Sequence, residues 1–442
     1  MNTKNYKLDR ERSFDVTRSI ARFSHNFNLD DLDKSVVTHA IHIVRDTLGV
    51  MLAGSILPEI KGLVTNTDVL SGPGISSLMG IEKTASPHFA ALVNGAGAVS
   101  LELDEGNQYA LNHPSVHILP AVLAVAEDQK RSGKDLLAAF IAGYEVAVRI
   151  GRATHLRDTV HPFGTHATVG TAVAVSMLSG LNIDETAEAI DISAGICIAS
   201  SQTAANSGAS VRNLITGLTN HNGILAPLLV RSGFTGERGA LDIVFGTILG
   251  DSFENKGITD DLGITYYIEK NYFKLHACSR WNHAPIEAMA NLLEREEFSV
   301  DDIAQIRVWT YDPATRLSWS NIANGYAAKH SIPYNVAARL IYRTNDIDAY
   351  ADDMVCDPRV KAVTDLIEVL EDPALTSMLP DVRPARVEVK LHNGNVLVER
   401  VDRPRGGFDR PLSETQLEEK FRRLAGTVIN ERAVSLLQDW LS

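Results

Sequence analysis

Carboxylates and a histidine are concentrated in one short stretch of the chain. Residues 101–106 read LELDEG, and His113 follows a few residues later, directly before Pro and Ser. Small residues precede this stretch, so we expect a helix to end here and to release Asp104, Glu105 and His113 into a loop. Loops held on a rigid scaffold can aim polar groups into a cleft. The pattern therefore indicates a functional site and not a part of the core.

A second histidine stands before a segment that is rich in Ala and Gly. Residues 160–166 read VHPFGTH, and residues 168–177 have the composition of a buried helix. His161 lies at the expected entrance of that helix, where free N–H groups and the helix dipole favour an anion. On this segment alone, a solvated loop histidine is an equally good interpretation.

A third cluster of polar residues lies within residues 274–283, which read KLHACSRWNH. Lys274 and Arg280 together suit the binding of a carboxylate or phosphate, because Arg offers bidentate geometry. A metal site of His276, Cys278 and His283 is an alternative, but the spacing matches no standard zinc pattern. A basic surface loop is the other alternative, and the presence of Cys and Trp makes it less attractive.

Arg212 precedes a further expected helix that contains Gly217 and Gly223, and by itself it is most simply a surface residue. The chain has no Walker motif, no GxGxxG after a strand, no GxSxG and no HExxH. Nucleotide, dinucleotide and serine-hydrolase functions therefore lack their usual signals. The remaining set of His, carboxylate, Lys and Arg suits proton abstraction next to a carboxylate, with cations stabilising the developing charge.

The composition is that of an ordinary globular protein, with 45% hydrophobic residues and a net charge of -13 over 442 residues. This length fits two domains. The negative charge argues against nucleic acid and against anionic membrane surfaces as partners, since both need a positive footprint. Apolar stretches such as residues 136–150 are interrupted by Glu145 and Arg149, so they are too short and too polar to span a bilayer.

Cysteine usage and the N-terminal sequence indicate a cytoplasmic protein. Cys197, Cys278 and Cys356 are widely spaced and form no CxxC motif, so a disulfide scaffold is not expected. The first residues are polar and contain no apolar segment of the kind that a signal peptide requires.

Hydrophobic periodicity divides the chain into two regions. Apolar residues recur at helical spacing from about residue 15 to 250, and after residue 265 alternating segments predict strands. Close helix packing is expected where Ala and Gly dominate, at residues 89–99, 168–177 and 217–227. Strands are expected at residues 306–311 and in a hairpin at 387–398 with Asn-Gly at its turn. Other helices are expected at residues 285–296, 335–342, 359–370, 413–424 (after a capping box that begins at Ser413) and 429–441.

The sequence thus predicts a mainly α protein. Residues 1–265 are expected to form a large all-helical domain, and residues 266–404 a smaller α+β lid domain. Helices within residues 405–442 are expected to return to the first domain and complete it.

In their order along the chain, these segments resemble the MmgE/PrpD family, which contains 2-methylcitrate dehydratase, cis-aconitate decarboxylase and iminodisuccinate epimerase. Residues 94–105, with His113-Pro-Ser, are similar to the family's acidic loop and HPS segment. Residues 161–162 are similar to its HP segment, and residues 274–283 to its K-x-Y-x-C-x-R-x-x-H stretch. Later landmarks are at residues 331–334, 405–406, 411–412 and 420–421.

The resemblance implies a helical domain with an α+β lid, a site between them, a homodimer, and no metal or organic cofactor. It places Asp104, His113, His161 and Lys274 in the pocket. Three positions depart from the family pattern. Gly106 stands where decarboxylase-like members have Thr, Arg212 stands where many members have Lys, and His276 replaces Tyr. An arginine keeps the positive charge but cannot give up a proton.

The leading hypothesis is a cofactor-independent lyase that abstracts a proton next to a carboxylate of a small di- or tricarboxylate. His161 is the candidate base, His113 its acid/base partner, and Asp104 orients a histidine or a substrate hydroxyl. Lys274 is a further candidate catalytic residue, which would hold a carboxylate. The candidate substrate-binding residues are Arg212, Arg280, Glu105 and His276. The alternatives are an epimerase of a dicarboxylate, a non-catalytic carboxylate-binding homologue and, more weakly, a metal-dependent hydrolase.

Overall fold

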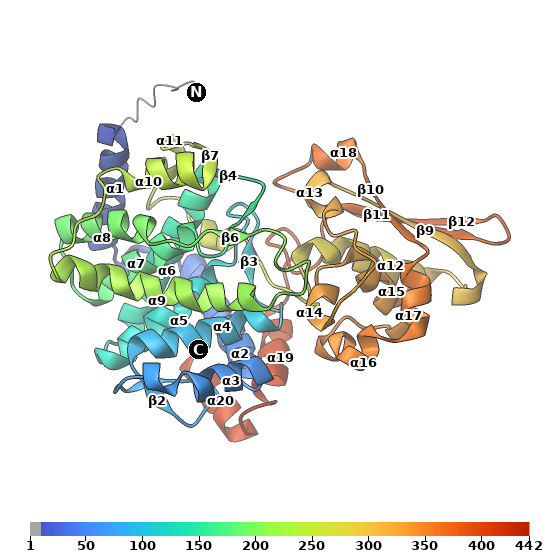
Figure 1. Ribbon diagram of the computed structural model, residues 1–442, viewed down its shortest axis with the longest axis horizontal. Coiled ribbons are helices and arrows are strands. Elements are labelled where there is room, and N and C mark those ends of the chain that lie inside the picture. The colour runs from blue at the N-terminus through green and yellow to red at the C-terminus, as the bar shows by residue number, and fades with distance from the viewer. Residues whose placement is uncertain (1–9, 442) are drawn as a thin grey trace.

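The computed structural model describes residues 10–441, which form two lobes side by side (Figure 1). We call the larger part the helical lobe and the smaller part, which contains β9 to β12, the α+β lobe. The mainly α fold class predicted from the sequence is confirmed. The prediction from the polar N-terminus rests largely on residues 1–9, which lie outside the described residues.

The helical lobe is built from the chain up to α11 and from the helices α19 and α20. Periodic apolar positions and local caps explain these elements: Ser86, for example, precedes Pro87 and its side chain accepts a hydrogen bond from the Phe89 amide. The helices are α1 (Arg10–His25), α2 (Lys34–Gly54), α3 (Pro58–Asn66), α4 (Pro87–Ser100), α5 (Pro114–Asp128), α6 (Gly133–Ala153), α7 (His166–Leu178), α8 (Ile183–Gly195), α9 (Val211–Arg231), α10 (Ala240–Ile243), α11 (Lys256–Thr259), α19 (Glu414–Ala425) and α20 (Glu431–Trp440).

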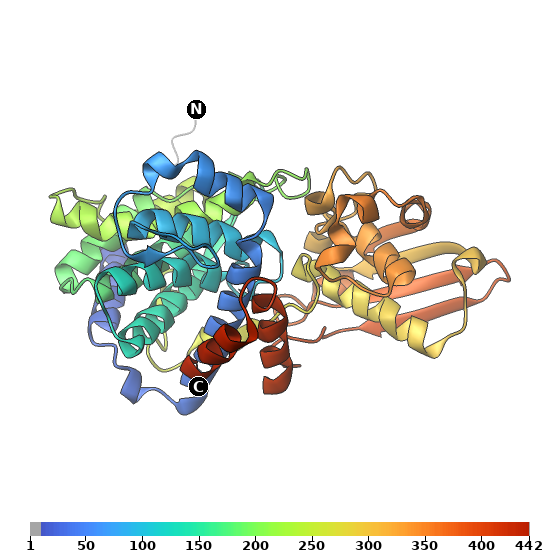
Figure 2. The same cartoon turned by 90° about the horizontal axis from the view of Figure 1, so that it is seen from below.

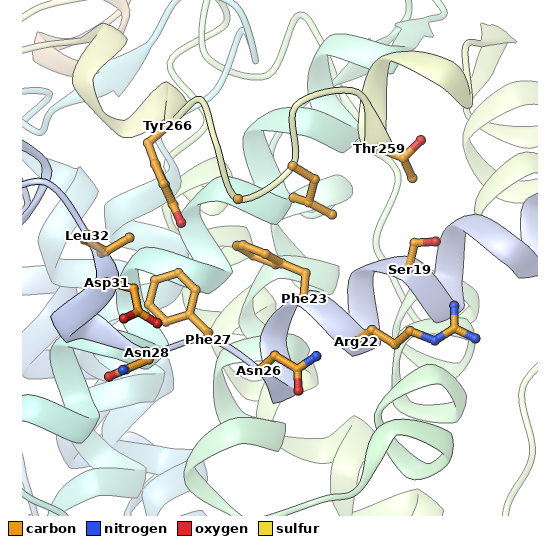
Figure 3. Close-up of a pocket in the computed structure, with 12 residues that line it drawn as sticks. Ser19, Arg22, Phe23, Asn26, Phe27, Asn28, Asp31, Leu32, Thr259 and Tyr266 are labelled. Atoms are coloured by element: carbon orange, nitrogen blue, oxygen red, sulfur yellow. The ribbon is translucent and has the colours of Figure 1, made fainter.

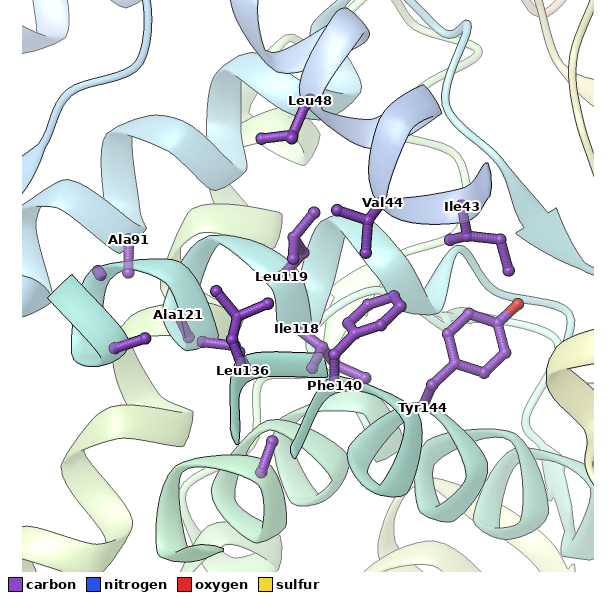
Figure 4. Packing of buried hydrophobic residues seen from close by; sticks show 14 of the residues in the cluster. Ile43, Val44, Leu48, Ala91, Ile118, Leu119, Ala121, Leu136, Phe140 and Tyr144 are labelled. Atoms are coloured by element: carbon purple, nitrogen blue, oxygen red, sulfur yellow. The ribbon is translucent and has the colours of Figure 1, made fainter. Parts of the chain in front are cut away.

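Small residues bring the central helices into close contact, as the sequence predicts. A Cβ atom on Gly217 of α9 would lie 2.1 Å from the Leu92 carbonyl of α4, and one on Gly143 of α6 would lie 2.6 Å from the Gly170 carbonyl of α7. Larger side chains from α2, α5 and α6 fill the adjoining core, including Ile118 and Phe140 (Figure 4). This packing gives the candidate site a rigid base.

Short two-stranded pairs join the loops of the helical lobe. They bring together segments that are far apart in the chain: β1 (Ser76–Ser77) with β2 (Thr84–Ala85), β3 (Gly106–Asn107) with β8 (Asn271–Tyr272), β4 (Thr154–Leu156) with β7 (Gly250–Phe253), and β5 (Val160–His161) with β6 (Ser200–Ser201). The pairs β3–β8 and β5–β6 contain candidate site residues or lie beside them.

The α+β lobe contains one four-stranded sheet in the order β10-β9-β11-β12. Its strands are β9 (Ile303–Thr310), β10 (Ile367–Glu371), β11 (Ala385–Leu391) and β12 (Val396–Val401), and the last two form the predicted hairpin. The helices of this lobe are α12 (His283–Arg295), α13 (Asp312–Thr315), α14 (Gly325–Ala328), α15 (Ile332–Tyr342), α16 (Asp352–Val355), α17 (Pro358–Thr364) and α18 (Pro373–Thr376). Alternate residues such as Ile306, Val308, Val387 and Val389 are buried in the core of this lobe.

One predicted helix is partly wrong. Residues 359–370 were expected to be helical throughout, but α17 ends at Thr364 and the chain continues into strand β10. β10 pairs in parallel with β9, for example Val369 with Val308. This tertiary pairing overrides the local helical pattern, because strand preference depends strongly on the neighbours that a strand finds.

The C-terminal helices pack against the helical lobe (Figure 2). α19 begins with the expected capping box between Ser413 and Gln416. Phe421 and Ala425 on this helix join the main core, and a Cβ on Gly49 of α2 would lie 3.2 Å from the Phe421 ring.

One helix of the described chain, α2, is long and apolar enough to cross a membrane by length and composition alone. Most of α2 is buried within the core of the helical lobe, which is the usual setting of such a helix in a globular protein. The three cysteines are unpaired, as expected.

The two connections between the lobes run next to each other. The Phe273 amide donates to the Gly406 carbonyl over 2.7 Å, and Tyr272 forms a bridge with Gly407. Elsewhere the lobes meet through side chains: the Tyr326 hydroxyl donates to Asn213 Oδ1 over 3.0 Å. The surface along which the two lobes meet is called the seam below.

Candidate active site

Residues 101–106, the acidic loop, begin where α4 ends. Glu102 has φ of +55°, in the left-handed region that glycine usually occupies after a helix. A non-glycine residue in this conformation costs on the order of 1 kcal/mol or more, and such strain is concentrated at functional sites. The conformation directs the Glu102 side chain to a buried set of charged groups, in which it is 1% exposed.

Two lysines from distant parts of the chain bind the backbone of the acidic loop. Lys329 Nζ, at the end of α14, donates to the carbonyls of Ser100 and Leu101 over 3.2 and 3.1 Å. A cation there satisfies free carbonyls at the negative end of α4. Lys420 Nζ on α19 donates to the Leu103 carbonyl over 2.8 Å. The α+β lobe and the C-terminal helix thus both fix the position of the loop.

The carboxylates of the loop bind Arg212 and Lys274. Arg212, in the first turn of α9, forms an ion pair with Glu102. Lys274 Nζ lies 3.0 Å from Glu102 Oε2 and 3.2 Å from Asp104 Oδ1, so it bridges the two carboxylates. All four charged groups are buried. The structure therefore brings Asp104, Lys274 and Arg212 together, as predicted, and adds Glu102.

The charges in this cluster hold one another in the ionised form. Burial would raise the pKa of Glu102, but the cations of Arg212 and Lys274 outweigh it and keep that pKa well below its usual range. For Asp104, burial is again outweighed, by His113 and then by Lys274, and its pKa is lowered. Burial opposes the charged form of Lys274, but Asp104 and Glu102 raise its pKa above the ordinary value. Lys274 is therefore a fixed cation.

His113 lies at the N-terminus of α5 and faces the acidic loop. Its Nδ1 atom lies 2.7 Å from Asp104 Oδ2 and 2.7 Å from the Glu105 carbonyl oxygen. Both neighbours are acceptors, so we assign the proton of the neutral ring to Nδ1. Nε2 then carries a free lone pair, and the Asp104 carboxylate stabilises the imidazolium that would form on proton uptake.

His161, in strand β5, shows the opposite arrangement. Its Nδ1 accepts the Phe163 amide hydrogen over 3.2 Å, so the proton of the neutral ring belongs on Nε2. Burial, followed by the charge of Arg212, lowers its pKa well below the ordinary value. With Nδ1 occupied as an acceptor and Nε2 protonated, His161 has no free lone pair. This hydrogen bond therefore does not suit the role of base that was expected for His161 from the sequence. In addition, α7 begins five residues later, at His166, so His161 is not at the entrance of that helix.

Phe163 holds the histidines and Arg212 in place. The rings of His113 and His161 meet it edge-on, with centroids 5.4 and 4.7 Å away. The Arg212 guanidinium lies over its face at 3.9 Å from the centroid. An arginine stacks on an aromatic face better than a lysine does, which gives the departure at position 212 a physical role.

The α+β lobe contributes a further histidine. His330, next to Lys329, lies with Nε2 3.8 Å from Glu102 Oε1. Burial lowers its pKa to about 4, which keeps it neutral at neutral pH. Its ring packs against Tyr326, whose hydroxyl reaches α9 across the seam.

Glu105 is not part of this cluster. Its carboxylate accepts from the Ser115 amide over 2.9 Å and from the Tyr144 hydroxyl over 3.0 Å, inside the helical lobe. Burial raises its pKa to about 7. The substrate-binding role expected from the sequence therefore has no support in its position. Glu105 instead connects the acidic loop to the start of α5.

His276 and Arg280 lie beside the acidic cluster and not within it. His276 packs against His283, with ring centroids 5.0 Å apart, and Arg280 Nη1 and Nη2 donate to the carbonyls of Arg405 and Pro404 over 2.8 and 2.9 Å. Among residues 10–441, no group of three His, Cys, Asp or Glu side chains has the arrangement of a metal site.

Gly106 departs from the family pattern because Tyr272 takes the space of a side chain. The two residues pair in the β3–β8 ladder, and a Cβ at position 106 would lie 2.4 Å from the Tyr272 hydroxyl oxygen. No real side chain is tolerated there unless Tyr272 moves.

Glu102, His330, Lys329 and Tyr272 are parts of the site that were not expected from the sequence. Glu102 was visible as one of three neighbouring carboxylates, but its direction depends on a backbone angle that the sequence does not reveal. His330 and Lys329 directly precede residues 331–334, a recognised landmark, and that proximity was the one available signal.

A separate hollow of about 470 Å³ lies between the end of α1 and residues 259–266 (Figure 3). Phe23, Phe27 and Tyr266 line it, with Arg22 and Asp31 as its charged residues. None of the predicted site residues lines this hollow.

The arrangement at the acidic loop defines the class of site. A free imidazole nitrogen, an imidazole N–H, and two buried cations meet at the seam, and together these groups can move protons on an anionic small molecule. The chain belongs to the MmgE/PrpD family: its residues 18–250 match the model of the family's N-terminal domain, and residues 276–440 match that of the C-terminal domain. The family prediction is confirmed.

Related proteins cover nearly the whole chain. A cis-aconitate decarboxylase-like protein of Aspergillus oryzae is 26% identical over 96% of this chain and 93% of its own length. The human cis-aconitate decarboxylase is 26% identical over 96% of this chain and 90% of its own. A mitochondrial 2-methylcitrate dehydratase of Yarrowia lipolytica is 27% identical over 92% and 83% of the two chains. The prediction of an enzyme of this type is confirmed at the level of the family.

Proposed function

We propose that the protein is a lyase that removes a proton next to a carboxylate of a small di- or tricarboxylate, without a metal or organic cofactor. The observation that carries the proposal is the opposite hydrogen bonding of His113 and His161 around Phe163, beside Arg212 and Lys274. A lone pair on one ring and an N–H on the other provide a proton acceptor and a hydrogen-bond donor.

In this proposal His113 Nε2 takes the proton and Asp104 stabilises the resulting imidazolium. His161 Nε2–H donates a hydrogen bond to the leaving oxygen or to the developing carbanion, and in a dehydration the hydroxyl leaves as water after taking up the proton that His113 holds. The sequence alone favours His161 as the base and His113 as its partner, so the proposal reverses the roles of the two histidines. Lys274 and Arg212 bind the carboxylate that stabilises the negative charge as the C–H bond breaks.

Dehydration or decarboxylation is favoured over epimerisation, because the relatives described above are named as decarboxylases and a dehydratase. An epimerase would use the same C–H abstraction as a dehydratase and would differ in returning a proton to the other face, whereas in a decarboxylation the departing CO2 leaves its electron pair on carbon and a histidine must supply a proton there. The homodimer, the cytoplasmic location, and the absence of nucleic acid or membrane as partners remain predictions of the sequence.

Proton NMR in D2O with citrate, 2-methylcitrate, cis-aconitate and related dicarboxylates tests the function. We expect a new alkene signal or deuterium incorporation with at least one acid, and the product identifies the reaction. Failure of every acid in the panel to exchange or react would contradict the proposal.

Two variants separate the histidine roles in the same experiment. His113→Asn should lose both turnover and hydrogen exchange, because no base remains. His161→Asn should lose turnover by about 100-fold or more but keep exchange at the substrate C–H. If His161→Asn lost hydrogen exchange and His113→Asn kept it, His161 would be the base. Melting temperatures of both variants check that the fold is intact.

A further inference from the structure

A second group of cations lies beside the acidic cluster at the seam. Arg280 and Arg383 are 6% and 8% exposed, and Tyr272 and Tyr311 are 4% and 2% exposed. The Arg280 guanidinium lies over the Tyr272 ring at 4.9 Å, and Arg383 Nη2 donates to the Gln108 carbonyl over 2.9 Å, two residues beyond Gly106. Arg280 and Tyr272 are therefore in contact, Arg383 binds the chain just beyond the acidic loop, and the Tyr311 hydroxyl is close enough to interact electrostatically with both arginines.

Neither guanidinium forms an ion pair with a carboxylate among residues 10–441. Arg280 donates to two backbone carbonyls and also lies 3.3 Å from His283 Nδ1, and Arg383 donates to one carbonyl. Burial lowers the pKa of Arg280 to about 10, and the positive charge of Arg383 adds to that fall. Two buried like charges without a counter-ion are unfavourable, so the protein retains positive charge here at a cost in stability.

The neighbouring carboxylates already have other partners. Glu287 forms an ion pair with Arg410 and accepts the Arg405 amide hydrogen over 3.0 Å. Asp104 binds His113 and Lys274. Within the described residues, these two carboxylates are therefore not free to form an ion pair with Arg280 or Arg383.

Two tyrosine hydroxyls complete the group. The Tyr311 hydroxyl is buried and has no hydrogen-bond partner in the described chain. The Tyr272 hydroxyl stands over Gly106, in the space that a side chain would fill. Burial raises the pKa of both groups, so each remains a proton donor. A buried donor without an acceptor is costly unless a ligand supplies one.

We propose that Arg280, Arg383, Tyr272 and Tyr311 form a subsite for a second carboxylate of the substrate. This proposal rests on the proposed function, in which Arg212 and Lys274 bind the carboxylate next to the reacting carbon. A ligand with carboxylates at both ends spans from one pair of cations to the other across the acidic loop. The substrate class is therefore a polycarboxylate, and a monocarboxylate leaves the second pair empty.

Tricarballylate, which has three carboxylates and no hydroxyl or double bond, is a suitable probe of binding without turnover. Its affinity is measured by isothermal titration calorimetry for the wild type, Arg383→Gln and Tyr311→Phe, with Arg359→Gln as the control. The Arg359 side chain is 70% exposed, so this control removes the same charge from the surface. We expect affinity to fall by about 10- to 100-fold for Arg383→Gln and by about 3- to 10-fold for Tyr311→Phe, and to stay unchanged in the control.

Tyr311→Phe guards against a purely structural effect. It removes a hydroxyl that has no partner, so the melting temperature without ligand should stay the same or rise while affinity falls. Affinity equal to that of the wild type in both variants would overturn the subsite, as would equal weakening by the surface control or no tricarballylate binding by the wild type.

The same data distinguish the subsite from the function. If tricarballylate binding depends on Arg383 but the protein turns over no acid, the subsite is supported and the lyase function is contradicted. If the protein turns over an acid and Arg383→Gln leaves the KM unchanged, the lyase function is supported and the subsite is contradicted.

Discussion

At the scale of single residues, the site depends on the directions in which the neighbouring carboxylate side chains point. Glu102 and Asp104 turn to the cations, and Glu105 turns into the helical lobe. The sequence predicted a site from the types of these residues, because carboxylates and His do not fill a core well. It could not assign Glu102, because the positive φ at that position is set by the packing around the loop and not by the residue itself.

The buried Glu105 leads to a prediction about stability and pH. Its pKa is raised to about 7 from 4.5, so as pH rises through that window the unfolded chain loses its proton before the folded protein does. Wild-type stability therefore falls relative to Glu105→Gln between pH 4.5 and 7. We compare the free energy of unfolding of Glu105→Gln with that of the wild type. At about 1.4 kcal/mol per pKa unit, this difference should shift in favour of the variant by on the order of 3 kcal/mol between pH 4.5 and pH 8.

Urea unfolding at the two pH values measures this difference. Glu297→Gln, at an exposed position, is the control and should show little change between them. An identical effect of Glu105→Gln at both pH values would show that Glu105 titrates normally in the folded protein.

At the scale of elements, helical periodicity and caps allowed most helices to be located from the sequence, with α4, α12 and α19 as clear cases. Strand β10 was missed because its partner β9 lies about sixty residues earlier in the chain, and no local pattern reports such a parallel pairing. The short β3–β8 pair was equally invisible, although it positions Tyr272 over Gly106.

The β3–β8 pair leads to a prediction about energetic coupling between Gly106 and Tyr272. Gly106→Ala should destabilise the protein by about 1–3 kcal/mol, since the added methyl group overlaps Tyr272. Tyr272→Ala removes the overlap, so the double variant should be more stable than the sum of the two single effects implies. Chemical unfolding of the four proteins in this cycle gives the coupling energy. Simple additivity would show that Tyr272 does not occupy the space above Gly106.

At the scale of the whole molecule, the site joins parts of the chain that are remote in sequence. The acidic loop lies in the helical lobe, Lys329 and His330 come from the α+β lobe, and Lys420 comes from α19. Helices that return to the helical lobe were expected within residues 405–442. It could not predict which polar side chain of α19 would reach the loop, because that depends on how this helix is rotated against α2.

Lys420 supports a prediction at this scale. Its amine binds the Leu103 carbonyl and lies 2.6 Å from Asp46 Oδ1, with both side chains buried. Lys420→Met should cost about 3–5 kcal/mol, because it leaves the Asp46 carboxylate buried without a partner. Adding Asp46→Asn should recover much of this stability but not the turnover, since the Leu103 carbonyl still lacks its donor.

Urea unfolding and steady-state kinetics of the single and double variants check both parts. Arg423→Met, which removes a half-exposed cation from the same helix, is the control. Full turnover in a stable double variant would show that Lys420 has no part in positioning the acidic loop.

The contact between Lys420 and Leu103 also has a consequence for synthesis of the chain. The two residues are 317 positions apart, and ribosomes add about 5–20 residues per second. The loop that holds the carboxylates is therefore made roughly 15–60 seconds before the lysine that fixes it. During that interval a nascent chain holds the acidic residues without their final support, so catalytic competence arrives only after α19 has left the ribosome.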